Sequence, residues 1–334
     1  MKTKFYNSYR LSKLKKITLI KKKIRKLRKN EILIKVIHTG ICGSDISTFL
    51  GHHPYKKPPI VCGHEIIGRV VDFGSLVKNL KLNDIVTVMP YNPCLKCVKC
   101  KNKDFNFCNN KAVPGYKNWD GGFSEYFIAK KESTFKVNKK INLLDAVLLE
   151  PMAISNHAMD LIKIKKKNLS TLIIGAGCIG LTSLINLKKN KNIGKIGCID
   201  KYKHKKTITK KLGANYFIQN VNVDLKKKLK HFTKSNGVDL IFLCTSYNRC
   251  LDEAVNLINE KGQIIILSYF EKKSMQSNIN KLLSKEIIVN GSYLSKLNNF
   301  KNSMDLILKK KTFPSRMISH ILPMSKTEDA FKMM

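Results

Sequence analysis

The sequence predicts an α/β protein of two domains, a mostly-β domain and a doubly wound domain. Short segments in which apolar and polar residues alternate, such as residues 31–37, indicate strands in the first half of the chain. From about residue 153, strand-like runs alternate with amphipathic helical stretches, as in a parallel sheet covered by helices. A chain of 334 residues with 43% hydrophobic content is long enough to form both cores.

In the first domain, residues 1–37 contain several short strand-like runs, and residues 68–72 and 84–89 add further strands between turns. In the second domain, six parallel strands are predicted. They cover residues 171–174, 195–199, 216–218, 238–243, 263–267 and 287–289. Helices are expected between them, for example over 203–212 and 250–258.

This pattern ends after Gly291, so the last forty or so residues are expected to return to the first domain. The predicted domains are therefore residues 1–153 with 292–334, and residues 154–291. Residues 90–110, which are rich in cysteine, form a separate lobe of the first domain.

The composition is strongly basic, with 63 Lys+Arg against 23 Asp+Glu and a formal net charge of +40. Such a balance is compatible with a polyanionic partner. The lysines are scattered along the whole chain together with abundant Ile and Asn, which favours compositional drift over a nucleic-acid site. The alternative of another class stays open: a non-catalytic nucleic-acid-binding protein that uses its basic surface and its cysteine lobe.

Ten cysteines are present, and no secretory signal is recognisable in residues 1–30. In a reducing cytosol, cysteines at metal-ligand spacing favour metal binding over disulfides. The longest apolar run, 172–187, is interrupted by three glycines and is too short to span a membrane. A cytoplasmic protein without a membrane segment is therefore expected.

A glycine fingerprint follows the strand predicted at 171–174, with the glycines at positions Gly175, Gly177 and Gly180. It opens a helix whose first residues are Cys178 and Ile179, the context required for binding the pyrophosphate of a dinucleotide. Asp200 ends the next strand, where a carboxylate would accept hydrogen bonds from the adenosine ribose and repel a 2′-phosphate. The predicted cofactor is therefore NAD, and Lys201 and Lys203 soften the preference over NADP.

Two groups of metal-ligand type occur in the first domain. One is the run Cys94, Cys97, Cys100 and Cys108, which has the density of a closed, structural four-thiolate zinc site. The other combines a thiol, an imidazole and carboxylates that suit a catalytic zinc, namely Cys42, His64, Glu65 and Glu150. Whether Glu65 or Glu150 is the third protein ligand is left open by the sequence.

These motifs, in this order, resemble the zinc-dependent medium-chain dehydrogenases, in the branch of the sorbitol, threonine and L-galactonate enzymes. The resemblance covers nearly the whole chain. It rests on the sequence GICGSD at 40–45, GHE at 63–65, the four-cysteine lobe, GGFSEY at 121–126, LEP at 149–151 and the glycine fingerprint.

The resemblance implies a GroES-like catalytic domain, a Rossmann cofactor domain and two zinc ions per chain. It also implies that a secondary alcohol of a polyol or sugar acid is oxidised to a ketone by hydride transfer to NAD. Ser44 matches the position that receives the hydroxyl proton, with Glu65 and Glu150 sharing metal and substrate roles. Asp45 is expected to orient a ligand. A homodimer or homotetramer is expected.

The chain departs from this family pattern at two places. Ser47 occupies the position of a proton-relay histidine, so His52, His53 or water is expected to take over that role. No arginine occurs in residues 291–295, which shifts the expected substrate from sorbitol towards a sugar acid or another secondary alcohol. L-Threonine oxidation is the alternative within the same class of enzymes.

Overall fold

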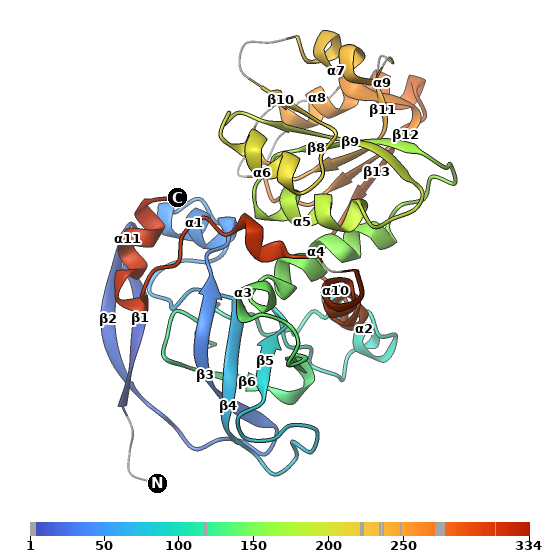
Figure 1. The fold of residues 1–334 in the computed structure, drawn as a ribbon. Helices are drawn as coiled ribbons and strands as arrows, with labels where there is room; N and C mark the ends of the chain where they lie inside the picture. Colours follow the sequence, from blue (N-terminus) through green and yellow to red (C-terminus); the bar gives the residue numbers. More distant parts are fainter. Residues whose placement is uncertain are drawn as a thin grey trace. The chain divides into compact units, whose positions relative to one another are not determined.

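The computed structural model of the chain (Figure 1) describes residues 5–116, 119–220, 224–233, 235, 237–247, 249–270, 278–310 and 312–334. It divides into two compact units. The first unit comprises Met1–Glu150 and Lys296–Met334, and the second comprises Pro151–Ser295. The assignment of residues 1–153 with 292–334 to a catalytic domain, of 154–291 to a cofactor domain and of 90–110 to a zinc lobe stays a prediction.

The first unit is mostly β-structure. Its strands are β1 (Phe5–Lys13), β2 (Lys16–Lys23), β3 (Glu31–Gly40), β4 (Glu65–Phe73), β5 (Ile85–Val88), β6 (Tyr126–Lys130) and β7 (Thr134–Lys136). Strands β1 and β2 form a hairpin, and the other five form an antiparallel sheet in the order β6-β3-β4-β5-β7. Ile32 and Ile34 of β3 pack with Ile66 and Val70 of β4 in the core, because alternate residues of a strand share one face.

The first unit also contains helices, the first of which carries Ser44 and Asp45. They are α1 (Gly43–Leu50), α2 (Val98–Lys101), α3 (Leu143–Ala146), α10 (Leu297–Lys310) and α11 (Thr327–Lys332), with single 3₁₀ turns η1 (Phe105–Phe107), η2 (Lys131–Ser133), η3 (Pro314–Met317) and η4 (Met324–Lys326). The C-terminal segment packs on the first unit through aromatic rings. Phe331 lies 5.4 Å from Phe49 and 5.1 Å from Phe123, and Phe300 stacks on Phe135 at 4.8 Å between ring centroids.

Glu31, at the start of β3, is a buried carboxylate with three donors. The Arg25 guanidinium donates to it from two nitrogens, at 2.6 and 2.8 Å, and the backbone N–H of Arg28 donates at 2.8 Å. Burial alone would raise the pKa of Glu31, but the hydrogen bonds from Arg25 and Arg28 outweigh it and lower the pKa. The charged form of Glu31 therefore stabilises the folded first unit.

Replacing Glu31 with glutamine is expected to lower the unfolding free energy by about 1–2 kcal/mol at neutral pH, because charge-assisted bonds to a buried group are lost. A lowered pKa gives stability that is present above the carboxyl's ordinary value and lost as pH falls through the lower folded value. The deficit of Glu31→Gln should therefore shrink below about pH 4. Denaturant titration at several pH values measures this. Asp305→Asn, in an exposed pair with Lys309, is the control, and an equal loss in both variants would contradict the assignment.

The second unit is a six-stranded parallel sheet. Its strands are β8 (Leu169–Ile174), β9 (Ile193–Asp200), β10 (Tyr216–Gln219), β11 (Val238–Leu243), β12 (Ile258–Ile266) and β13 (Ile288–Gly291), in the order β10-β9-β8-β11-β12-β13. The helices are α4 (Leu149–Asp160), which begins in the first unit, α5 (Cys178–Leu187), α6 (Lys205–Lys211), α7 (Leu225–Thr233), α8 (Cys250–Leu257) and α9 (Ile279–Ser284). The chain reverses its direction of winding between β8 and β11, where doubly wound sheets bind their ligands.

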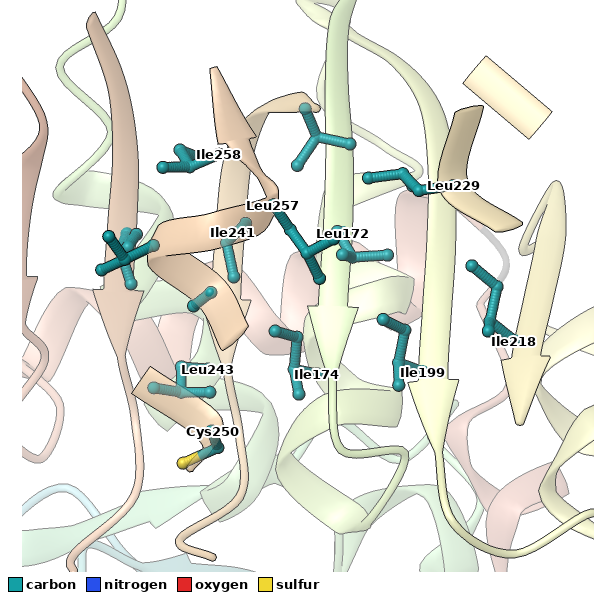
Figure 2. Packing of buried hydrophobic residues seen from close by; sticks show 14 of the residues in the cluster. Leu172, Ile174, Ile199, Ile218, Leu229, Ile241, Leu243, Cys250, Leu257 and Ile258 are labelled. Carbon is teal, nitrogen blue, oxygen red and sulfur yellow. The ribbon is translucent and has the colours of Figure 1, made fainter. Parts of the chain in front are cut away.

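The central strands of this sheet contain buried apolar runs, for example at 172–174 in β8 and at 240–243 in β11, because helices cover both faces of the sheet. Figure 2 shows Leu172 and Ile174 of β8 beside Ile241 of β11 on one face of the sheet, with Leu257 of α8 packed against them. Leu229 of α7 belongs to the same cluster. This core holds the carboxyl ends of the strands, and the loops that follow them, in fixed positions.

The predicted α/β fold, with a mostly-β part and a doubly wound sheet, is confirmed. One element differs in type at its end: Ile258, predicted as the last residue of a helix, begins β12 instead. Ile258 pairs with Val238 of β11 in the parallel sheet, so pairing with a neighbouring strand overrides the local helical pattern. In the described part of the chain, no helix is long and apolar enough to cross a membrane.

Candidate metal and cofactor sites

Three residues of metal-ligand type meet at one end of the antiparallel sheet. Strand β3 ends at Gly40, Cys42 caps α1, and β4 begins with Glu65 directly after His64. One ligand atom of each of Cys42, His64 and Glu65 lies within 4.8 Å of the others. Residues 22 positions apart in sequence are brought together because Gly40 and Glu65 pair in the β3–β4 ladder.

Gly40 leaves room for the Glu65 carboxylate. A Cβ atom at position 40 would lie 1.9 Å from Oε2 of Glu65 and 3.0 Å from its Cδ. Any side chain there would displace the carboxylate from the other two donors. The glycine of the GICGSD motif is therefore a packing requirement of this site.

Asp45 connects the two segments that carry the donors. It is fully buried, and its carboxylate accepts the backbone N–H of Cys42 at 3.3 Å and that of Gly63 at 3.4 Å. One Asp45 oxygen lies 3.7 Å from Nδ1 of His64, a buried nitrogen that has no hydrogen-bond partner. This arrangement leaves Nε2 of His64 to act as a ligand, as is usual for a metal-bound imidazole supported by a carboxylate.

The electrostatics of the site favour a bound cation. Burial raises the pKa of Glu65 to about 7, although the charge of His64 opposes the rise. Burial also raises the pKa of Glu150 to about 8. For His64, burial lowers the pKa, but the Asp45 carboxylate and the Cys42 thiol outweigh burial and raise it. Several acids held in one buried place need a compensating positive charge to ionise together.

Glu150 is the second residue of α4, is buried and belongs to the same unit as Cys42. It is not a member of the close set of three donors, but its charge interacts with His64, Glu65 and Asp45. Ser44 lies in the first turn of α1 and is half-buried. Of these predicted residues, the structure thus groups Cys42, His64 and Glu65 most closely.

His53 and Lys56 lie in the loop between α1 and β4. Both are buried, and Nδ1 of His53 accepts the backbone N–H groups of Tyr55 and Lys56 at 3.4 and 3.1 Å. Burial, and then the charge of Lys56, lower the pKa of His53 to about 4. His53 is therefore neutral at pH 7, with one nitrogen already in use. Sequence analysis missed Lys56, because nothing distinguishes it from the neighbouring exposed lysines.

The second metal-ligand group is formed by the cysteine lobe around α2. Cys94 and Cys100 lie 4.0 Å apart and Cys97 and Cys108 lie 3.9 Å apart, sulfur to sulfur. A tetrahedral zinc with Zn–S bonds of about 2.3 Å requires sulfurs about 3.8 Å apart. Backbone N–H groups lower the pKa of Cys94 to about 6, which favours the thiolate form. All ten cysteines are free thiols, so the four sulfurs fit a metal and not a disulfide.

The glycine fingerprint lies between β8 and α5, at the carboxyl end of the parallel sheet. Gly175 has φ +97°, and a Cβ there would approach Thr245 to 2.8 Å. A Cβ on Gly180 would lie 1.9 Å from the Gly175 carbonyl oxygen, whereas Gly177 faces open space. Two glycines thus permit close packing and one leaves room for a ligand. Cys178 and Ile179 begin α5, whose first N–H groups point towards that space.

Asp200, the last residue of β9, is tied to this loop. Its carboxylate accepts the backbone N–H of Ala176 at 2.7 Å and that of Tyr202 at 2.9 Å. The glycine loop and Asp200, which are separated in the sequence by helix α5 and strand β9, are thus adjacent. A dinucleotide lying over Gly177 would therefore meet this carboxylate next.

Comparison with known proteins identifies two family domains in the chain. Residues 28–139 match the alcohol dehydrogenase GroES-like domain, and residues 178–309 match the zinc-binding dehydrogenase domain. The chain is 30% identical to the sorbitol dehydrogenase of Halalkalibacterium halodurans over 91% of this chain and 88% of that protein. It is also 30% identical to the D-arabitol-phosphate dehydrogenase of Enterococcus avium, over 90% of this chain and 86% of that protein.

A solved structure of a related dehydrogenase has the same fold. The short chain alcohol dehydrogenase rspB of Escherichia coli CFT073, complexed with NADH, superposes with a TM-score of 0.90 and 28% sequence identity, covering 98% of this chain and 95% of that one. A GroES-like unit with a zinc-type donor set and a Rossmann unit with a glycine loop define a zinc-dependent oxidoreductase. The chain belongs to the zinc-dependent medium-chain alcohol dehydrogenase family. The resemblance predicted from the sequence motifs is confirmed.

Proposed function

We propose that this protein oxidises the secondary alcohol of a polyol or sugar acid to a ketone, with NAD as the hydride acceptor. The observation that supports this most directly is the close group of Cys42, His64 and Glu65, with the buried acid Glu150 in the same unit. A thiolate, an imidazole and a carboxylate leave a fourth tetrahedral position for substrate. A zinc ion there would supply Lewis-acid stabilisation of an alcohol oxygen.

The residues around the donors have separate roles in this proposal. Cys42, His64 and Glu65 hold the ion, Asp45 orients the His64 ring, and Glu150 exchanges with Glu65 as a ligand or contacts the substrate. Ser44 receives the hydroxyl proton in this proposal. Because His53 is neutral and its Nδ1 already accepts two N–H groups, the proton passes to solvent through His52 or water.

The remaining groups complete the enzyme. The four thiolates of Cys94, Cys97, Cys100 and Cys108 hold a second, structural zinc. Gly175, Gly177, Cys178, Ile179 and Gly180 cradle the pyrophosphate, and Asp200 selects NAD by accepting hydrogen bonds from the ribose. A homodimer or homotetramer is our proposal for the assembly. A donor set open for substrate argues against the alternative of a non-catalytic nucleic-acid-binding protein.

The test is NADH production by zinc-loaded protein across matched substrates. Galactitol, sorbitol, L-galactonate, L-idonate and L-threonine are each supplied with NAD, with and without a strong chelator. We expect turnover of a polyol or an aldonate and its loss on chelation, because the ion supplies several kcal/mol of barrier reduction. Turnover of L-threonine alone would move the assignment to threonine oxidation. Turnover that persists after verified removal of both metal ions would refute the zinc mechanism.

A further inference from the structure

Lys56 is a buried lysine that the proposed machinery does not use. Its side chain and backbone together are only 5% exposed, whereas the next residue, Lys57, is exposed. The loop that carries Lys56 is fixed by His53, whose Nδ1 accepts the Lys56 backbone N–H at 3.1 Å. Lysines are almost never fully buried unless they are paired, so this position requires an explanation.

The Lys56 ammonium has no protein partner in the described part of the chain. Its backbone N–H bond to His53 is its only hydrogen bond, and it forms no ion pair there. Nζ is also absent from the buried polar atoms that lack partners, so it keeps contact with solvent. The aliphatic stem is therefore covered by protein while the charged tip reaches solvent.

This tip lies in the field of the metal-site acids. The charge of Lys56 lowers the pKa of His53. Burial raises the pKa of Asp45, but His64 and, to a smaller extent, Lys56 outweigh burial and lower it. The pKa of Glu150 is raised by burial, and Lys56 opposes the rise. The charge of Lys56 thus acts on acids that belong to the proposed metal site.

We propose that Lys56 binds an anionic group of the substrate, so that the enzyme prefers polyols carrying a carboxylate or a phosphate over neutral polyols. This inference rests on the proposed oxidation at the Cys42 site and names the substrate class for it. A cation whose stem is held by the protein and whose tip has no protein partner is free to form a direct charge-assisted bond with an anion. The lysine ammonium is a compact charge with three donors, which suits either anion.

The loop adds a surface for the carbon chain of such a substrate. Tyr55, beside Lys56, is 45% exposed, and its ring lies edge-on to His53 at 4.5 Å and to Tyr116 at 5.4 Å between centroids. An exposed aromatic ring on the loop that carries Lys56 offers an apolar wall to the C–H groups of a substrate.

The experiment compares three ligands that differ in charge: galactitol, L-galactonate and galactitol 1-phosphate. Each is assayed with zinc-loaded wild-type protein and with the variants Lys56→Met, Lys56→Arg and Lys57→Met. Removing a charge-assisted bond of about 1.5–3 kcal/mol should raise KM for the anionic substrates about 10- to 100-fold. The increase in KM for the neutral substrate galactitol should be at least about tenfold smaller than for the anionic substrates. Lys56→Arg should recover part of the loss, and Lys57→Met, which removes an exposed charge, should match the wild type.

Equal increases in KM for neutral and anionic substrates in Lys56→Met would overturn the inference, because Lys56 would then act only on the acids of the proposed metal site. The larger effect among the two anions names the carboxylate or the phosphate as the natural group. If no compound is oxidised, calorimetric binding of the same three compounds to the zinc-loaded protein decides. Anion binding that Lys56→Met abolishes would support the anion site while the proposed oxidation fails, and anion binding unaffected by Lys56→Met would refute the site.

Discussion

Replacing Cys42 with serine is expected to remove one of the two zinc ions proposed above and to lower kcat/KM about a thousandfold or more. A neutral hydroxyl is a far weaker zinc ligand than a thiolate, and the remaining donors His64 and Glu65 do not complete a tetrahedron. Loss of the Lewis acid removes several kcal/mol of barrier reduction, and each 1.36 kcal/mol is about tenfold in rate. Metal analysis and steady-state kinetics on the same preparation measure both effects.

Cys62 provides a matched control for this variant. It is buried two residues before His64, but it belongs to an apolar cluster with Val61 and Phe123 and to neither metal group. Cys62→Ala should therefore keep two zinc ions per chain and most of the activity, at a moderate loss of stability. If Cys42→Ser also kept both ions, the proposed catalytic ligand set would be wrong.

The fold was predictable where local pattern and tertiary structure agree. Val238–Leu243 is an apolar run interrupted only by Asp239, and it is strand β11 with the predicted bounds. The same reasoning assigned Ile258 to a helix, because its partner Val238 lies 20 positions away in the sequence and only the assembled sheet brings the two strands together. Periodicity reports which residues are apolar, whereas it does not report which strand will be adjacent.

The residues of the candidate sites were predictable where residue type and spacing alone indicate a ligand. The spacing of four cysteines and of three glycines has few other interpretations. No sequence pattern predicts the burial of Lys56 or the two hydrogen bonds accepted by Nδ1 of His53. Both depend on the folded conformation of the loop from 51 to 60. The carboxylate of Glu65 fits likewise only because Gly40 has no side chain, and the two residues become neighbours only when β3 and β4 pair.

Replacing Cys108 with serine is the complementary prediction, and its largest effect is expected on the structure of the cysteine lobe. Cys108 is fully buried, its sulfur accepts the Cys94 backbone N–H at 3.3 Å, and it lies 3.9 Å from the sulfur of Cys97. Structural zinc sites contribute directly to folding, by about 10–16 kcal/mol in small zinc-binding peptides. Cys108→Ser should therefore lose one zinc ion and make the chain around residues 94–108 sensitive to protease.

The two cysteine variants together separate the two sites. Cys108→Ser should retain the ion held by Cys42 and His64, so its kcat/KM at low temperature should exceed that of Cys42→Ser by at least about tenfold. Cys42→Ser should leave the lobe resistant to protease, because the four sulfurs of the lobe come from a separate segment of the chain. Cys62→Ala again serves as the control for the loss of a buried thiol. A protease-resistant Cys108→Ser protein that still held two zinc ions would show that side-chain packing, and not a metal, stabilises the lobe.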